Sequence, residues 1–269
     1  MPYLYETHLH TKESSACGKS SGYEYIQKYL DAGYSGIIVT DHFYRGYTAV
    51  NKNLSWDKWV NQYCMGFEKA REEGIRRGLD VFFGWEETFE GDDYLIYGLD
   101  KQWLLEHPQA AYWNRKRQYD EVKRGGGCVV QAHPFRQAHY INTIHLSTGC
   151  VDAVEAANAG NERDWDVLAF RYAKKLNLPV TAGSDTHSAI NVNADSVYGV
   201  YMDKKMESIT DFVNAIRNDK KDSRRCSITG LKVPDGHFES GGSEQILLPV
   251  DIRDSRDRST GNAAEFLGE

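Results

Sequence analysis

Short apolar runs, rich in β-branched and aromatic residues, recur through the first 200 residues of the chain. Most of them are continuous rather than alternating, which is typical of parallel strands that are covered on both faces. The predicted strands are Tyr3–Tyr5, Gly36–Thr40, Val81–Trp85, Tyr94–Leu99, Cys128–Gln131, Val151–Ala156, Val180–Ala182 and Val197–Tyr201.

Longer amphipathic stretches lie between these runs and predict helices. Ser55 stands where an N-cap is expected, and Gly33 and Gly78 each follow a stretch, as glycines at helix ends do. Strand and helix alternate over more than 200 residues, which favours a parallel sheet closed into a TIM-like α/β barrel. The predicted helices are Tyr23–Ala32, Ser55–Gly78, Tyr112–Arg124, Asp164–Leu176 and Ser208–Asp219.

The pattern changes after about Leu231, where glycines and a charged run, Asp251–Arg258, replace the alternation. We expect residues 1–231 to form the barrel and residues 232–269 to form a C-terminal extension that packs on it in part and frays at its end. One strand-like piece, Ile246–Val250, interrupts the extension, which carries no recognisable chemistry.

Composition narrows the class of protein. The chain has 269 residues, 41% of them hydrophobic, and a net charge of −7, which suits a soluble globular domain and argues against a dedicated nucleic-acid binder. Five cysteines without a C-x-x-C pair predict neither a disulfide framework nor a zinc ribbon. With no signal peptide or membrane-spanning run in the sequence, we expect a cytoplasmic protein.

Histidines are the most informative residues, because five of the nine directly follow predicted strands. In an α/β barrel the carboxyl ends of the strands converge on one face, where active sites are built. We therefore expect seven side chains from strand ends to meet: His8, His10, His42, Glu86, His133, Asp185 and His187.

Spacing within the motifs refines this expectation. Side chains at i and i+2 of a strand point to the same side, so His8 and His10 form one pair and Asp185 and His187 another. With Glu86 between them, these groups make the mixed imidazole and carboxylate set that zinc, manganese or iron prefers.

Three further polar residues are expected to support the site. Asp41 is adjacent to His42 and so points to the other side of the chain, where it would orient an imidazole rather than bind the metal. Glu155 and Asn158 follow another predicted strand and are candidates for a supporting or a substrate-contacting role.

The ordered motifs resemble those of the PHP (polymerase and histidinol phosphatase) superfamily over roughly residues 3–220, and in particular its stand-alone bacterial histidinol-phosphatase-like members. The motifs are His8-Leu9-His10-Thr11, Thr40-Asp41-His42, Gly84-Trp85-Glu86, Ala132-His133-Pro134 and Gly183-Ser184-Asp185-Thr186-His187. The resemblance implies a distorted (β/α)7 barrel that holds two or three divalent metals and hydrolyses a phosphate ester.

The resemblance also implies a role for each ligand. His8, His10, Glu86 and Asp185 would form the catalytic centre around a first metal. Glu86 would bridge to a second metal, which His133 also holds. His42 and His187 would take part in a third site.

The sequence departs from the family pattern at two positions. The family usually has a His or Asp where Ser15 or Ala16 stands here, and Glu13 or Cys17 is the candidate replacement. A second family histidine corresponds to Leu95, for which Asp93, two residues earlier on the same strand face, is the candidate replacement.

A metal-activated hydroxide would attack the phosphate, so no protein nucleophile is required. Arg136 is the leading candidate for clamping the phosphate, because guanidinium matches two oxygens at once. Lys19, Arg45 and His139 are further candidates for substrate contacts, and for each cation the alternative is a solvated surface position.

The predicted function is hydrolysis of a small phosphorylated metabolite, such as histidinol phosphate or a nucleotide. A PHP-type nuclease or exonuclease is one alternative, although a basic groove is missing from the sequence. The other is a non-catalytic, metal-binding regulatory module whose ligand set has decayed at Ser15 and Leu95. The sequence leaves the oligomeric state open.

Overall fold

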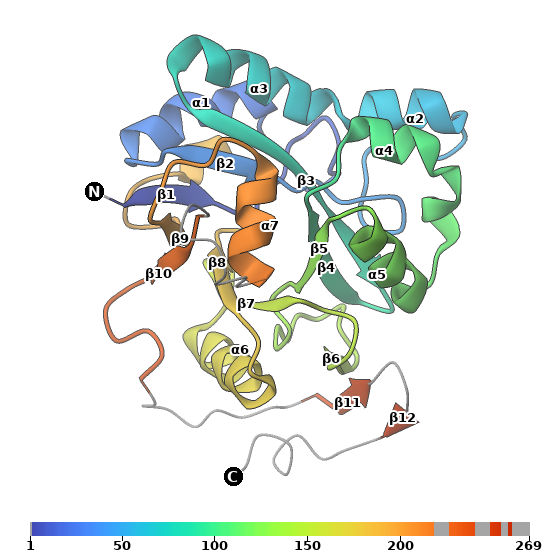
Figure 1. The fold of residues 1–269 in the computed structure, drawn as a ribbon, viewed down its shortest axis with the longest axis vertical. Helices are drawn as coiled ribbons and strands as arrows, with labels where there is room; N and C mark the ends of the chain where they lie inside the picture. The colour runs from blue at the N-terminus through green and yellow to red at the C-terminus, as the bar shows by residue number, and fades with distance from the viewer. Residues whose placement is uncertain (1, 218–225, 240–247, 254–257, 260–269) are drawn as a thin grey trace.

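The computed structural model describes residues 2–217, 226–239, 248–253 and 258–259. A nine-stranded sheet in the order β10-β9-β1-β2-β3-β4-β5-β7-β8 curves round on itself, with helices on its outside (Figure 1). Its strands are β1 (Tyr3–Glu6), β2 (Gly36–Val39), β3 (Asp80–Phe89), β4 (Asp92–Tyr97), β5 (Cys128–Gln131), β7 (Ala153–Asn158), β8 (Val180–Gly183), β9 (Gly199–Met202) and β10 (Ile228–Lys232).

The other elements surround this sheet or follow it. A second, three-stranded sheet contains β6 (Ile144–Ser147), β11 (Val250–Arg253) and β12 (Arg258–Ser259). The helices are α1 (Gly22–Asp31), α2 (Trp56–Tyr63), α3 (Met65–Arg77), α4 (Lys101–Glu106), α5 (Arg115–Arg124), α6 (Arg163–Leu176) and α7 (Ile209–Arg217), with 3-10 helices at Pro108–Tyr112 and Ala189–Asn191.

The sheet forms a nearly closed barrel, which confirms the predicted fold class. It closes where the chain leaves β1 and β8: Leu9 forms a parallel bridge with Thr186, and the backbone N–H of His10 donates to the Thr186 carbonyl at 2.9 Å. Helix α7 covers the opposite end, where Phe212 packs on Tyr97 and Arg217 donates to the carbonyl of Gly127, just before β5. The end that carries the histidine motifs stays open.

A buried carboxylate fastens this closure. Oε1 of Glu6 accepts from the backbone N–H groups of Thr7, His8 and Ser184, each at 2.9 Å, and Oε2 accepts from the hydroxyls of Ser184 and Tyr29. Glu6 is fully buried, and burial raises the pKa of its carboxyl even though these hydrogen bonds oppose the shift. One side chain therefore ties the end of β1 to the end of β8.

The predicted parallel sheet is in fact mixed. Strand β4 runs antiparallel to both β3 and β5, and β9 runs antiparallel to β1. The reason for β4 is the two-residue turn Glu90–Gly91, whose φ values of 56° and 96° fit the type I′ turn of a tight hairpin. A parallel connection would need a dozen or more residues.

The predicted helix Ser55–Gly78 is two helices, α2 and α3, that meet at Cys64. An aromatic ring on α2 packs against a cluster that adjoins two site positions: Trp59 lies 5.2 Å from Phe43, and Phe43 lies 5.6 Å from Trp85 (ring centroids). Since Phe43 follows His42 and Trp85 precedes Glu86, this cluster fixes the backbone on both sides of the site.

The chain from β10 onwards contributes to both sheets, and four of the five residues of β10 precede residue 232, where the predicted extension begins. Strand β10 pairs with β9, and β11 pairs in parallel with β6. The expected fraying of residues 260–269 lies outside the described residues, as do residues 246–247 of the predicted strand Ile246–Val250 and residues 218–219 of the last predicted helix. Within the described ranges, none of the helices combines the length and apolarity that crossing a bilayer requires.

Replacing Glu6 tests the closure. Glu6→Ala should lower the free energy of unfolding by more than about 2 kcal/mol, because several buried donors lose their acceptor, and Glu6→Gln should cost less. Urea denaturation measures both, with Glu72→Ala on the exposed side of α3 as the control. Equal stabilities for Glu6→Ala and the control would show that the carboxylate does not fasten the barrel.

Candidate metal centre

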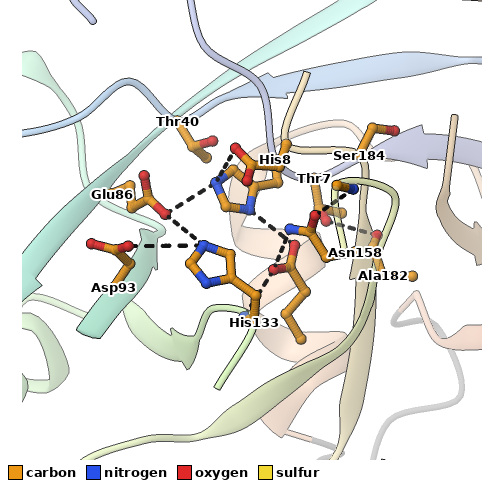
Figure 2. Close-up of polar contacts among 12 residues, drawn as sticks. Thr7, His8, Thr40, Glu86, Asp93, His133, Asn158, Ala182 and Ser184 are labelled. Atoms are coloured by element: carbon orange, nitrogen blue, oxygen red, sulfur yellow. Dashed lines mark hydrogen bonds and ion pairs between the residues drawn. The ribbon is translucent and has the colours of Figure 1, made fainter. Parts of the chain in front are cut away.

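The seven strand-end side chains meet at the open end of the barrel. Nε2 of His8 lies 3.1 Å from Nε2 of His10, 3.1 Å from Oε1 of Glu86 and 3.5 Å from Oδ1 of Asp185 (Figure 2 shows His8 beside Glu86). Nε2 of His10 lies 3.0 Å from the same Asp185 oxygen. The parallel bridge between Leu9 and Thr186 brings His8 and His10 beside Asp185, which lies about 175 residues later in the sequence.

His8 is oriented by a carboxylate behind it. Its Nδ1 lies 3.0 Å from Oε1 of Glu155, whose other oxygen accepts from the Asn158 amide at 2.9 Å and from the backbone N–H of His133 at 3.1 Å. Nδ1 is therefore committed to Glu155, and Nε2 is the atom that a metal would take. Glu155 therefore lies directly behind His8, and Asn158 lies beside Glu155.

His10 is oriented through a serine. Asp41 accepts from the backbone N–H and the hydroxyl of Thr11, at 2.6 and 2.7 Å, and from the hydroxyl of Ser15 at 2.6 Å. Since Ser15 gives its proton to Asp41, its oxygen accepts from Nδ1 of His10 at 3.2 Å. Burial lowers the pKa of His10 to about 3, so the ring is neutral and presents a lone pair at Nε2.

The ionised carboxylates of the centre favour binding of a cation. Burial opposes ionisation of Glu86 and Asp185, yet His42 and His8 lower the pKa of Glu86, and His8 and Arg136 lower that of Asp185. Burial likewise disfavours charge on His8, but Glu155, Asp185 and Glu86 raise its pKa. Two ionised carboxylates thus meet with imidazoles at one point, where a divalent cation can replace the ring protons.

A second group of donors shares Glu86. Nε2 of His133 lies 3.4 Å from Oε1 of Glu86 and 3.9 Å from Oδ2 of Asp93 (Figure 2). The β3–β4 register pairs Glu86 with Leu95 and Thr88 with Asp93, so Asp93 lies on the Glu86 face, as its spacing predicts. The hydroxyl of Thr88 donates to Asp93 at 2.5 Å.

A third group contains His10, Cys17, His42 and His187, whose donor atoms lie within 4.8 Å of one another. The rings of His10 and His187 stack with centroids 4.6 Å apart. Burial opposes ionisation of the Cys17 thiol, but hydrogen bonds with His187 and His42 lower its pKa. Of the two candidate replacements near Ser15, the structure brings Cys17 to this group and not Glu13.

Glu13, Lys19 and His139 do not lie at the site. The Glu13 carboxylate accepts from the Ser21 hydroxyl and from Lys69 at 2.8 Å, and this pairing holds it at the start of α1. Lys19 is exposed, and its backbone N–H rather than its side chain approaches the site, donating to the His187 carbonyl at 2.7 Å. His139 is exposed beside Tyr140 and is absent from the cavity wall.

A cavity of about 680 Å³ opens over the three groups. Arg45 and Arg136 both line it, and each is fixed by an acidic partner: Arg45 by Glu87 at 3.2 Å and Arg136 by Asp185 at 2.7 Å. Arg136 is therefore not a solvated surface side chain. It neutralises one oxygen of Asp185 and leaves the other to face His8 and His10.

Sequence reasoning missed several residues that build the site. Glu6 and Asn161 gave no signal as site residues, Thr11 was noted only as part of a motif, and Ser15 was considered only as a metal ligand. Two ligand positions also have uncommon backbone conformations, with φ of 28° at His133 and 52° at Asp185. Such positive φ values in residues other than glycine concentrate at functional sites.

The residues fit divalent metal ions. Nδ1 of His42 and Oε2 of Glu86 are buried, lie 2.7 Å apart and make no well-directed hydrogen bond among the described residues. Buried polar atoms without a well-directed hydrogen bond are costly, and a cation bound to both atoms would satisfy them. The fold and site define a barrel whose strand ends carry clusters of histidines and carboxylates that could hold metal ions.

Comparison with known proteins agrees with this fold. A PHP-associated family profile matches residues 167–220. A two-domain protein from Bacteroides vulgatus that contains a predicted PHP-like metal-dependent phosphoesterase is 18% identical with a TM-score of 0.61, over 81% of this chain and 64% of that one. PsfC from Pseudomonas syringae is 14% identical with a TM-score of 0.50, over 88% and 93%. None of the curated proteins matches.

The solved structures share the fold, and this chain spans only 64% of the length of the Bacteroides protein. The profile match is confined to residues 167–220, and the solved structures show a shared fold.

Metal binding should stabilise the protein. At a free Zn²⁺ or Mn²⁺ concentration one hundred times its Kd, the gain is about 2.7 kcal/mol, which differential scanning fluorimetry detects as a rise in Tm. Asp185→Asn removes a donor shared by His8 and His10 and should abolish most of this rise. Asp195→Asn, at an exposed turn, should keep it; an equal rise in both variants would remove Asp185 from the ligand set.

Proposed function

We propose that the protein is a metal-dependent phosphoesterase that hydrolyses a small phosphorylated metabolite. The observation that carries the proposal is the position of Glu86, whose carboxylate lies between the His8, His10 and Asp185 donors and the His133 and Asp93 donors. A carboxylate shared by two neighbouring sets of ligands is suited to bridging two metal ions.

Two divalent ions, when bound, would polarise a phosphoryl oxygen and lower the pKa of water enough to supply hydroxide near neutral pH. The protein's own residues hold the ligands in position. Glu155 orients His8, and the pair Asp41 and Ser15 orients His10. Arg136 fixes Asp185. Such partners of the ligands determine metal affinity nearly as much as the ligands do.

The cavity wall supports binding of a phosphorylated substrate. Among the residues that the structure describes, Nε, Nη1 and Nη2 of Arg136 donate to Asn161, Asp185 and Asn158 respectively. Guanidinium has five N–H groups, so one remains on each Nη to bind two phosphate oxygens. Arg45, held by Glu87 and stacked on Phe89, supplies a second cation on the same wall.

We further propose that the third group holds an ion through Cys17, His42 and His187. Thiolate is a soft ligand that favours zinc or iron over magnesium. All five cysteines are free thiols, which agrees with a reducing, cytoplasmic location.

The division into a barrel of residues 1–231 and an extension of residues 232–269 also stays a proposal. The same holds for histidinol phosphate and nucleotides as substrates.

A phosphomonoester screen with added Mn²⁺ or Zn²⁺ tests the activity. We expect turnover that a chelator abolishes, and a loss of more than about 100-fold in kcat for His8→Ala and Asp185→Asn, since even removing partners of ligands costs about 10–100-fold. Asp195→Asn is the matched control. Wild-type turnover in the two ligand variants would exclude the mechanism, and cleavage of phosphodiesters alone would favour the nuclease alternative.

Cobalt substitution tests the role of Cys17. The Co²⁺-loaded protein should show a thiolate-to-cobalt charge-transfer band that is missing in Cys17→Ser, because this thiol is the one beside His42 and His187. Cys226→Ser, which alters a thiol elsewhere in the barrel, should leave the band unchanged. A band that survives in Cys17→Ser would place the thiolate outside the third group.

A further inference from the structure

A short segment of the C-terminal extension docks beside the site. Residues Pro234–Glu239 follow β10 and run past the first turn of α6 (Figure 1). There the Arg163 guanidinium donates to three backbone carbonyls of the segment, those of Gly236 at 2.7 Å, His237 at 2.9 Å and Glu239 at 2.5 Å. Because one guanidinium group binds three of its carbonyls, the path of the segment is fixed.

This path inserts an imidazole into the protein. His237 is 7% exposed, and its Nε2 donates to Oδ2 of Asp166 at 2.8 Å. Asp166, on α6, is itself 1% exposed and accepts from the Asn161 amide at 2.8 Å and from the backbone N–H of Asn158 at 3.2 Å. The carboxylate thus depends on three donors, one of which comes from the extension.

The hydrogen bonds continue from Asp166 to the metal centre. Oδ1 of Asn161 accepts from Nε of Arg136 at 2.8 Å, and Nη1 of Arg136 donates to Oδ2 of Asp185 at 2.7 Å. His237, Asp166, Asn161, Arg136 and Asp185 therefore form one unbroken chain of side chains. A branch through Asn158 reaches Glu155 and His8.

We propose that His237 is a positioning residue of the metal centre: through Asp166 and Asn161 it holds the Arg136 guanidinium in the orientation that presents Asp185 to the metal. This inference rests on the proposed metal-dependent function. It gives the extension a task in the chemistry of the barrel, where the sequence showed none.

The proposal depends on the direction of each hydrogen bond in this series of side chains. Asn161 must present its amide N–H to Asp166 in order to present its oxygen to Arg136. When His237 is removed, the buried Asp166 loses a donor, and water or a reoriented Asn161 amide replaces it. Because interior hydrogen bonds are strong and polarise one another, such a loss passes along the network, and sites tolerate little displacement of their supporting side chains.

The test follows the Nε–H of Arg136 by NMR in protein without added metal, so it requires no activity. The signal is identified by its loss in Arg136→Lys. In His237→Ala we expect its exchange with water to be about tenfold faster, as when a hydrogen bond to a charged group is lost. His237→Gln, whose amide can still donate to Asp166, should restore slow exchange.

A control variant in the same segment distinguishes loss of the His237 hydrogen bond from a general loosening of the segment on the barrel. Phe238 stacks on Phe170 with centroids 4.4 Å apart and takes no part in the chain. Phe238→Leu should lower Tm as much as His237→Ala does or more, yet leave the Arg136 exchange unchanged. Unchanged exchange in His237→Ala, or equal acceleration in both variants, would overturn the proposal.

Metal affinity provides the functional readout. Competition with a chelating dye should show Mn²⁺ bound about 3- to 10-fold more weakly by His237→Ala, below the roughly 10–100-fold typical when a direct partner of a ligand is lost, with His237→Gln near wild type. If the wild type hydrolyses no phosphomonoester but these differences hold, the proposed function fails and the positioning role stands. If turnover is found and affinity is the same in all three proteins, the positioning role fails alone.

Discussion

The pairing of the chain after β1 with the chain after β8 is the interaction on which the centre depends. Leu9 opposite Thr186 sets His8 beside Asp185 and His10 beside His187. Without it, ligands separated by about 175 residues would have no fixed relation. Glu6 makes the pairing strong by giving one buried carboxylate to donors on both sides. The same contact that closes the barrel therefore assembles the site, so fold stability and metal binding are coupled.

The sequence predicted most of the barrel and the convergence of its ligands, because both follow from local pattern. Apolar runs mark buried strands, and strand ends meet by geometry. The strand Tyr94–Leu99 was predicted, but its antiparallel direction was missed, because the turn Glu90–Gly91 lacks the Asn-Gly or Asp-Gly signal of a tight hairpin. Spacing placed Asp93 on the face of Glu86, whereas Glu13 was drawn to Lys69, a partner 56 residues away that no local pattern reveals.

The supporting residues were harder to predict, for a related reason. Ser15 is a poor ligand, but between Asp41 and His10 it sets the tautomer of an imidazole. His237 and Asp166 are 71 residues apart and meet only in the folded chain. Such contacts depend on tertiary packing and leave no periodic trace, and the geometry of a metal centre depends on them as much as on its ligands.

Anomalous X-ray diffraction from crystals grown with Zn²⁺ or Mn²⁺ tests the central claim most directly. The account predicts one metal peak among His8, His10, Glu86 and Asp185, and a second on the far side of Glu86 beside His133. The third peak would lie at Cys17. Crystals that bind the metal elsewhere, with no anomalous density on either side of Glu86, would contradict the shared-carboxylate centre and the hydrolytic function built on it.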